Sequence, residues 1–308
     1  MKKIIILVVF ILMVPFLIVS FYDVDSKKEI ELRYVYNMII RVKRLESEQI
    51  EYIPFEEYIV GVLAGEMPIY FNKEAFKAQA VAARSYALKR MEYNKDNDYD
   101  VVDSVMNQVY LDNGYLKNAW GDKYVENINK LKEVVNETSG EYLEYDGDVV
   151  DALFFSTSNG YTEDAITVFN VDLPYLQSVE SFWDSETSSV FKASKTISAS
   201  NFYKILGLEY SENLNVKVLR RSSTNRIIDI RINGYDFLGK DLYNKLGLRS
   251  TDFSLYQDGD SVIIKTTGYG HGVGMSQYGA LGMANEGYTY EEILNYYYVG
   301  TEIKKMVN

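Results

Sequence analysis

Cysteine is absent from the 308-residue sequence, and histidine occurs only once, at His271. The lack of cysteine excludes disulfides, a thiolate nucleophile and a zinc site built from thiolates. The single histidine excludes a histidine-rich metal site, and a Ser-His-Asp triad would depend on His271 alone.

Positive charge is also scarce, because 32 Lys and Arg residues stand against 44 Asp and Glu, which gives a net charge of −12. This balance argues against nucleic acid as a partner of the whole chain. Any anionic polymer would need local basic residues. The composition is otherwise that of a globular protein, with 47% hydrophobic residues, and the length allows one large domain or two modest ones.

The N-terminus carries the one long uncharged run, over residues 4–22, directly after Lys2 and Lys3. About 20 such residues span the hydrocarbon core of a bilayer, and the basic end stays in the cytoplasm. We therefore expect residues 1–28 to form a single-pass anchor and tether, with the rest of the chain outside. A cleaved signal peptide is the alternative, but the run lacks a small-residue cleavage site.

A carboxylate lies among apolar residues in the segment 61–68, at Glu66. A short helix is expected to begin after Pro54 and to end at Glu66, because Pro68 cannot continue it. Apolar neighbours disfavour the charged form, so the pKa of Glu66 should rise toward the value that a general acid needs near neutral pH. The plain alternative is an ordinary helix-end glutamate in water.

An alanine-rich helix is expected to follow, capped by Asn72 and extending to about Tyr93. Its alanines allow close packing against a neighbouring helix. Lys77 and Arg84 are seven residues apart, which is two turns on one face. Both cations can therefore point into the same groove.

The remaining patterns predict an α+β fold, in which a mostly antiparallel β core carries helices around a substrate groove. Extended segments are expected at 32–42, 49–53, 101–110, 141–145 and 149–155, and helices at 124–136 and 289–298. Between 185 and 261 the pattern changes to short helices and alternating strands, typical of a smaller inserted α/β subdomain. The core would then comprise 29–184 and 262–308.

Two loops are candidate binding segments. Ser158, Asn159 and Tyr161 follow an expected strand and could present polar groups to a ligand, although a plain turn is equally compatible with them. The segment 268–280 combines alternating glycines, which allow positive φ, with His271. It lacks the Gly-Lys-Ser/Thr ending of a phosphate-binding loop.

Three ordered blocks of the sequence resemble one family. The first block comprises residues 56–58, Gly-Glu-Met-Pro at 65–68 and the expected helix 74–86. The second comprises residues 155–163 and 174–176. The third is Gly-His-Gly-Val-Gly-Met-Ser-Gln-Tyr-Gly-Ala at 270–280. The chain is similar to the stage II sporulation protein D family, which also contains amidase-enhancer relatives. The resemblance covers nearly everything after the expected anchor.

The resemblance implies a lytic transglycosylase of peptidoglycan that acts during engulfment, held in the mother-cell membrane and facing the septal space. It implies that Glu66 is catalytic and that basic residues of the following helix bind substrate. The candidate substrate-binding residues are Lys77, Arg84, Ser158, Asn159, Tyr161, His271, Gln277 and Tyr278. The implied partners are glycan strands stripped of stem peptides, a cell-wall amidase and a membrane scaffold of the engulfment machinery.

One position departs from the family pattern. Some relatives bind zinc through a histidine before Gln-x-Tyr and through nearby cysteines, whereas this chain has Asn107 there and no cysteine. We therefore expect no metal and no cofactor.

A single carboxyl group suffices for the implied reaction, because the nucleophile is the substrate's own 6-hydroxyl. Glu66 would protonate the glycosidic oxygen between N-acetylmuramic acid and N-acetylglucosamine, and would then accept the proton of the 6-hydroxyl as a 1,6-anhydro ring closes. Most glycosidases instead pair two carboxylates. The alternative function is a glycan-binding enhancer of an amidase that cuts nothing. If Glu66 is not the acid, Glu163 is the next candidate.

Overall fold

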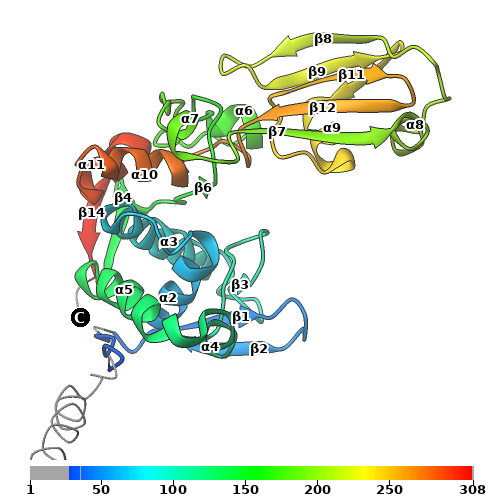
Figure 1. Ribbon diagram of the computed structural model, residues 1–308. Coiled ribbons are helices and arrows are strands. Elements are labelled where there is room, and N and C mark those ends of the chain that lie inside the picture. Colours follow the sequence, from blue (N-terminus) through cyan, green and yellow to red (C-terminus); the bar gives the residue numbers. More distant parts are fainter. Residues whose placement is uncertain (1–27, 35, 307–308) are drawn as a thin grey trace, which may run out of the picture.

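The computed structural model describes residues 28–34 and 36–306. Within these residues, none of the helices combines the length and the apolar character needed to cross a bilayer. The anchor expected over residues 4–22 lies outside the described residues. The described chain forms a larger, mainly helical module and a smaller, sheet-rich module, which Figure 1 shows at opposite ends of the folded chain.

Helices form the centre of the larger module. They are α2 (Phe55–Glu66), α3 (Lys73–Tyr93), α4 (Asn113–Trp120), α5 (Tyr124–Glu137), α6 (Ala165–Phe169), α7 (Asp184–Thr187), α10 (Gln277–Asn285) and α11 (Tyr290–Tyr297), with a 3-10 turn at Gly121–Lys123. The central α3 contacts α2 and α5 on one side and α10 and α11 on the other (Figure 1). The alanines of α3 are buried, and their small side chains let these helices approach closely.

Three small sheets flank the helices. They have the orders β2-β1-β3, β14-β4-β5 and β13-β6, with β1 (Ile39–Lys43), β2 (Ile50–Pro54), β3 (Val101–Val102), β4 (Glu141–Tyr145), β5 (Asp148–Val149), β6 (Phe154–Phe155), β13 (Met275–Ser276) and β14 (Glu302–Lys305). The α+β class with several antiparallel sheets is confirmed. A mostly β core is not observed, because the strands are short and the helices supply the centre.

The ends of the central helices agree with the sequence. Pro54 directly precedes α2, which ends at Glu66 as expected. The side chain of Asn72 caps α3 by accepting a hydrogen bond from the N–H of Glu74 at 3.0 Å, and α3 ends at Tyr93.

The smaller module is inserted between α7 and β13. Its elements are β7 (Lys192–Ser198), α8 (Ala199–Leu206), β8 (Val216–Arg221), β9 (Ile227–Ile232), β10 (Tyr235–Leu238), α9 (Gly239–Leu246), β11 (Phe253–Asp258) and β12 (Ser261–Thr267). Two antiparallel sheets, β10-β9-β8 and β11-β12-β7, share one apolar cluster with α8 and α9. All of β12 pairs with β7 and β11, so residues 262–267 belong to this module and not to the core, where the sequence placed them.

Candidate active site

Glu66 lies where the end of α2 meets the loop 103–111 and the start of α10. Its Oε1 accepts a hydrogen bond from the backbone N–H of Val109 at 2.6 Å, and its Oε2 lies 3.5 Å from Nε2 of Gln277. The side chain is partly buried. Burial raises the pKa of the Glu66 carboxyl, while the two hydrogen bonds oppose that rise. Burial therefore favours the protonated form of Glu66 more than water does, while the two donors can stabilise the anion.

Two glycines of α2 bring the loop 103–111 to Glu66. A Cβ atom at Gly65 would lie 2.5 Å from the carbonyl oxygen of Val109, and one at Gly61 would lie 2.3 Å from the ring of Tyr110. Any larger residue would push the loop away from the helix. The glycine beside the glutamate is therefore what allows the N–H of Val109 to reach the carboxyl group.

The loop 103–111 is itself held by polar side chains. The amide of Asn107 donates to the hydroxyl of Tyr86 at 3.0 Å and accepts from the N–H of Val102 at 2.9 Å. Gln108 accepts from the hydroxyl of Tyr58 at 3.0 Å. Asn107 thus fixes the conformation of this loop through its hydrogen bonds. In the part of the chain that the structure describes, no group of three or more His, Asp or Glu side chains is arranged to hold a metal ion.

A buried carboxylate fixes the start of α10 and, with it, Gln277. Asp184 is fully buried and accepts hydrogen bonds from the N–H of Ser158 at 2.8 Å and from the hydroxyls of Ser181 and Ser276. Ser276 also caps α10, directly before Gln277. Sequence reasoning missed Asp184, because its partners Ser158 and Ser276 lie 26 and 92 residues away along the chain.

Two tyrosines provide an aromatic surface near Glu66. The hydroxyl of Tyr70 lies 3.2 Å from that of Tyr278, and the ring of Tyr278 packs edge-on against Phe71 at 4.9 Å. Tyr70 is 67% exposed. A sugar ring that reaches Glu66 can therefore pack against an exposed aromatic ring.

Lys77 and Arg84 do not share an open groove, which corrects the expectation from their spacing. Arg84 is fully buried and its guanidinium pairs with Glu56 at 2.9 Å. Lys77 pairs with Glu74 at 2.8 Å and with Glu137 at 2.9 Å. Spacing on a helix identifies a shared face, but this face is covered by carboxylates of the protein itself.

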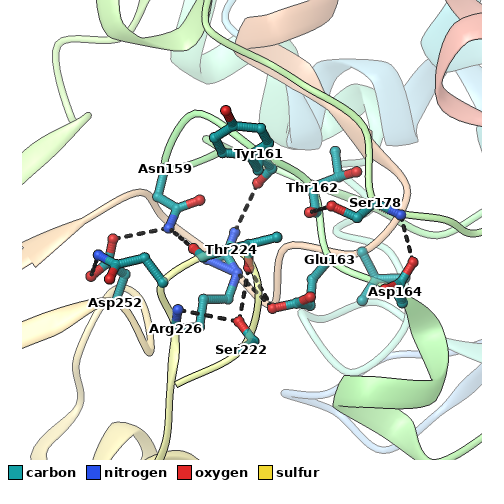
Figure 2. A network of polar contacts seen from close by, with 12 residues as sticks. Asn159, Tyr161, Thr162, Glu163, Asp164, Ser178, Ser222, Thr224, Arg226 and Asp252 are labelled. Carbon is teal, nitrogen blue, oxygen red and sulfur yellow. Dashed lines mark hydrogen bonds and ion pairs between the residues drawn. The ribbon is translucent and has the colours of Figure 1, made fainter. Parts of the chain in front are cut away.

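The loop 158–163 joins the two modules (Figure 2). The described hydrogen bonds of Glu66 are with Val109 and Gln277 and not with this loop. The amide of Asn159 donates to Thr224 O at 2.8 Å and to Asp252 Oδ2 at 2.9 Å. The hydroxyl of Ser158 is buried and donates to a backbone carbonyl. Of the three loop residues expected to bind substrate, Ser158 is buried, Asn159 is partly buried, and Tyr161 is 46% exposed.

Glu163 lies deep in the same joint (Figure 2). It is 1% exposed, accepts a hydrogen bond from the hydroxyl of Thr224, and lies 3.9 Å from the guanidinium of Arg226. Arg226 comes from the smaller module and packs against Gly272, where a Cβ atom would lie 2.5 Å from its Nη2. This burial leaves Glu163 without access to a surface substrate.

The side chain of His271 is also held by contacts within the protein. Its Nδ1 accepts a hydrogen bond from the N–H of Val273 at 3.1 Å, and its ring packs against Phe155 and Phe169 at 5.7 and 5.5 Å. Burial lowers the pKa of His271 to about 4, so the ring is neutral at neutral pH. These contacts fix the ring within the glycine loop, and a role of His271 in substrate binding stays a prediction.

The structure therefore brings together two of the residues singled out in the sequence, Glu66 and Gln277, and Tyr278 follows Gln277 in α10. Val109 is an addition that the sequence did not reveal, because it acts through its backbone N–H. The close pair of glycines in α2 was its only sequence signal.

Comparisons with known proteins identify relatives of this chain. The family model described as stage II sporulation protein matches residues 43–145. The chain is 42% identical over 271 residues to stage II sporulation protein D of Bacillus subtilis (strain 168), covering 86% of this chain and 79% of that protein. It is 40% identical to the protein of the same name from Bacillus amyloliquefaciens, covering 86% and 78%. It is also 30% identical over 297 residues to the amidase enhancer of Bacillus subtilis (strain 168), covering 79% of this chain and 40% of that protein. The chain belongs to the stage II sporulation protein D family.

Proposed function

We propose that this protein is a peptidoglycan lytic transglycosylase of sporulation, with Glu66 as its acid and base. One observation carries the proposal: a partly buried carboxyl group of raised pKa accepts hydrogen bonds from two neutral donors beside an exposed tyrosine. Both contacts of Glu66 are with donors, the N–H of Val109 and the amide of Gln277. Among the described hydrogen bonds and ion pairs of Glu66, none is with a second carboxyl group, and the reaction needs only one.

Protonated Glu66 gives its proton to the glycosidic oxygen as the bond from that oxygen to C1 of N-acetylmuramic acid breaks. The N-acetylglucosamine part leaves as an alcohol. The Glu66 carboxylate, stabilised by Val109 and Gln277, then takes the proton of the 6-hydroxyl while that oxygen bonds to C1. The enzyme returns to its starting state, and no water is consumed.

Product analysis in isotopically labelled water tests this reaction. The full-length chain, solubilised in detergent, is incubated with glycan strands in H₂¹⁸O, and the ends are identified by mass spectrometry. We expect 1,6-anhydro ends without ¹⁸O. New reducing ends that carry ¹⁸O, in excess of those in an incubation without the protein, would show a hydrolase and would refute the proposal.

A second candidate function is a non-catalytic enhancer of a cell-wall amidase. It is favoured by the 30% identity to the amidase enhancer and by the lack of a second carboxyl group among the described hydrogen-bond partners of Glu66. The two functions separate when glycan is incubated with the chain alone and with added amidase. An enhancer gives no new glycan ends alone but accelerates the release of stem peptides.

The proposal includes a location and partners. The uncharged run 4–22 after two lysines supports a single-pass anchor that leaves the site outside the cytoplasm. In that position the enzyme meets glycan strands that an amidase has stripped, and a membrane scaffold can recruit it. Recovery of the intact chain in the soluble cell fraction would refute the anchor.

A further inference from the structure

The smaller module, residues 192–267, differs in charge from the rest of the chain. It contains 12 Lys and Arg against 8 Asp and Glu, whereas the remaining residues contain 20 against 36. A basic module in an acidic protein concentrates the attraction for anions in one place.

One face of the sheet β11-β12-β7 is open. The helix α8 contacts β7 and β12, and the side chains that alternate with the buried ones are exposed or partly exposed. The register places Lys265 opposite Ser194 on one side and Ser254 on the other, and Lys192 opposite Thr267. All these side chains share the open face. The two lysines are diagonal neighbours on adjacent strands, which corresponds to a backbone separation of about 7–8 Å.

This face and the end of β8 form an open groove of about 600 Å³, which we call the basic groove. Its polar lining includes Lys192, Ser194, Arg221, Asp252, Lys265 and Thr267. Arg221 lies 3.5 Å from Asp252, so the one acidic residue is already paired. Neither Lys192 nor Lys265 forms an ion pair with any residue in the described ranges.

The chemistry of the basic groove is mixed. Beside its lysines it offers hydroxyls of serine and threonine, and the half-exposed ring of Tyr256 lies 5.5 Å from Nζ of Lys265. Hydroxyls and an aromatic ring suit sugars, whereas lysines suit isolated carboxylates. The groove presents two lysines without ion pairs among the described residues, and these match isolated carboxylates better than the continuous charge of a phosphate polymer.

The basic groove adjoins the joint between the modules. Asp252 binds the amide of Asn159 from the larger module at 2.9 Å, as Figure 2 shows. The exposed ring of Tyr161 follows in the same loop. A polymer chain bound in the basic groove can therefore also reach the larger module at this loop.

We propose that the basic groove is a second glycan-binding site, which holds carboxylates of a peptidoglycan strand through Lys192 and Lys265. The identity of this polymer rests on the proposed function. A strand stripped of stem peptides carries a lactyl carboxylate on every N-acetylmuramic acid, so its charges are isolated and regularly spaced. Binding there holds a long strand to the protein independently of the contact at Glu66.

Cosedimentation with insoluble, peptide-free glycan tests the site. The full-length chain in detergent carries Glu66→Gln to prevent cleavage, with Lys192→Glu and Lys265→Glu added. The matched control carries Lys204→Glu and Lys217→Glu, the same charge change at exposed positions on α8 and β8. We expect the groove variant to bind on the order of tenfold more weakly than the control at low salt. The difference should vanish at about 1 M salt, where charges are screened.

Two further polymers identify the ligand. Chitin has the same acetamido sugars without lactyl carboxylates, and on chitin the two variants should bind alike. The proposal is overturned if both variants bind peptide-free glycan equally or if neither binds it. It is also overturned if the groove variant binds chitin more weakly than the control by the same factor as it binds glycan. Displacement by polyglycerol phosphate in preference to glycan would also overturn it, in favour of a phosphate polymer. If the wild-type chain cuts no glycan, the proposed function fails while the binding result still stands.

Discussion

Replacing Asp184 by alanine should both destabilise the larger module and misplace the amide of Gln277. The carboxylate of Asp184 accepts from the N–H of Ser158 and from the hydroxyls of Ser181 and Ser276, all inside the protein. Each hydroxyl has a second partner within 3.3 Å and can partly compensate. The N–H of Ser158 has no such second partner among its described hydrogen bonds.

The size of the effect follows from these contacts. A buried N–H without a partner costs about 1–3 kcal/mol, and weakened hydroxyl contacts add to it, so Asp184→Ala should lower the free energy of unfolding by about 2–4 kcal/mol. Since Ser276 caps α10 directly before Gln277, the start of the helix should shift. Misplacement by about 1 Å can lower the rate up to 100-fold, so kcat should fall by about 10- to 100-fold while KM changes little.

Asp184→Asn is the matched control. Its remaining oxygen can still accept from Ser158, and its amide can donate to a hydroxyl, so it should lose only about 1 kcal/mol and keep most of the activity. Urea unfolding and glycan-cleavage kinetics measure both variants. If Asp184→Ala unfolds at the same urea concentration as the wild type, or if alanine and asparagine lower kcat equally, the positioning role is refuted.

Three further changes test other parts of the account. Since cleavage begins from protonated Glu66, whose pKa burial raises, kcat/KM should fall as the pH rises through that pKa, and a flat pH–rate profile would contradict this. Gly65→Ala places a Cβ 2.5 Å from a backbone oxygen of the loop 103–111, so the rate of glycan cleavage should drop by about 10-fold or more. An unchanged rate would show that the close approach of α2 to this loop is unimportant for catalysis. Arg84→Met leaves Glu56 buried without its partner, so urea unfolding should show a loss of about 3–5 kcal/mol; a loss below about 1 kcal/mol would place the pair with ordinary surface ion pairs.

Local signals in the sequence predicted local structure well. Prolines indicated the two ends of α2 and a capping asparagine the start of α3, and the position of Glu66 at the end of α2 followed from the prolines. The rise in its pKa was also predicted from its apolar neighbours. These inferences needed only residues within about two helical turns of each other.

Inferences that depended on distant partners were less reliable. Helical spacing showed that Lys77 and Arg84 share a face, but not that Glu56, 28 residues before Arg84, would bury it in an ion pair. The segment 101–110 was expected to be extended, yet only Val101–Val102 pairs as a strand. The rest of that loop is held by side chains of α2 and α3. The spacing of residues within the loop does not reveal such contacts.

Glu66→Gln tests the central claim most directly. Glutamine keeps the size and can accept the hydrogen bond from Val109, but it has no proton to transfer, so the variant should unfold at the wild-type urea concentration. General acid–base catalysis contributes about 10²–10⁴-fold, and one residue here serves both steps, so the loss of 1,6-anhydro ends should reach or exceed the top of that range. The measurement is mass spectrometry of peptide-free glycan after incubation with each full-length chain. Formation of 1,6-anhydro ends by Glu66→Gln at close to the wild-type rate would contradict the account.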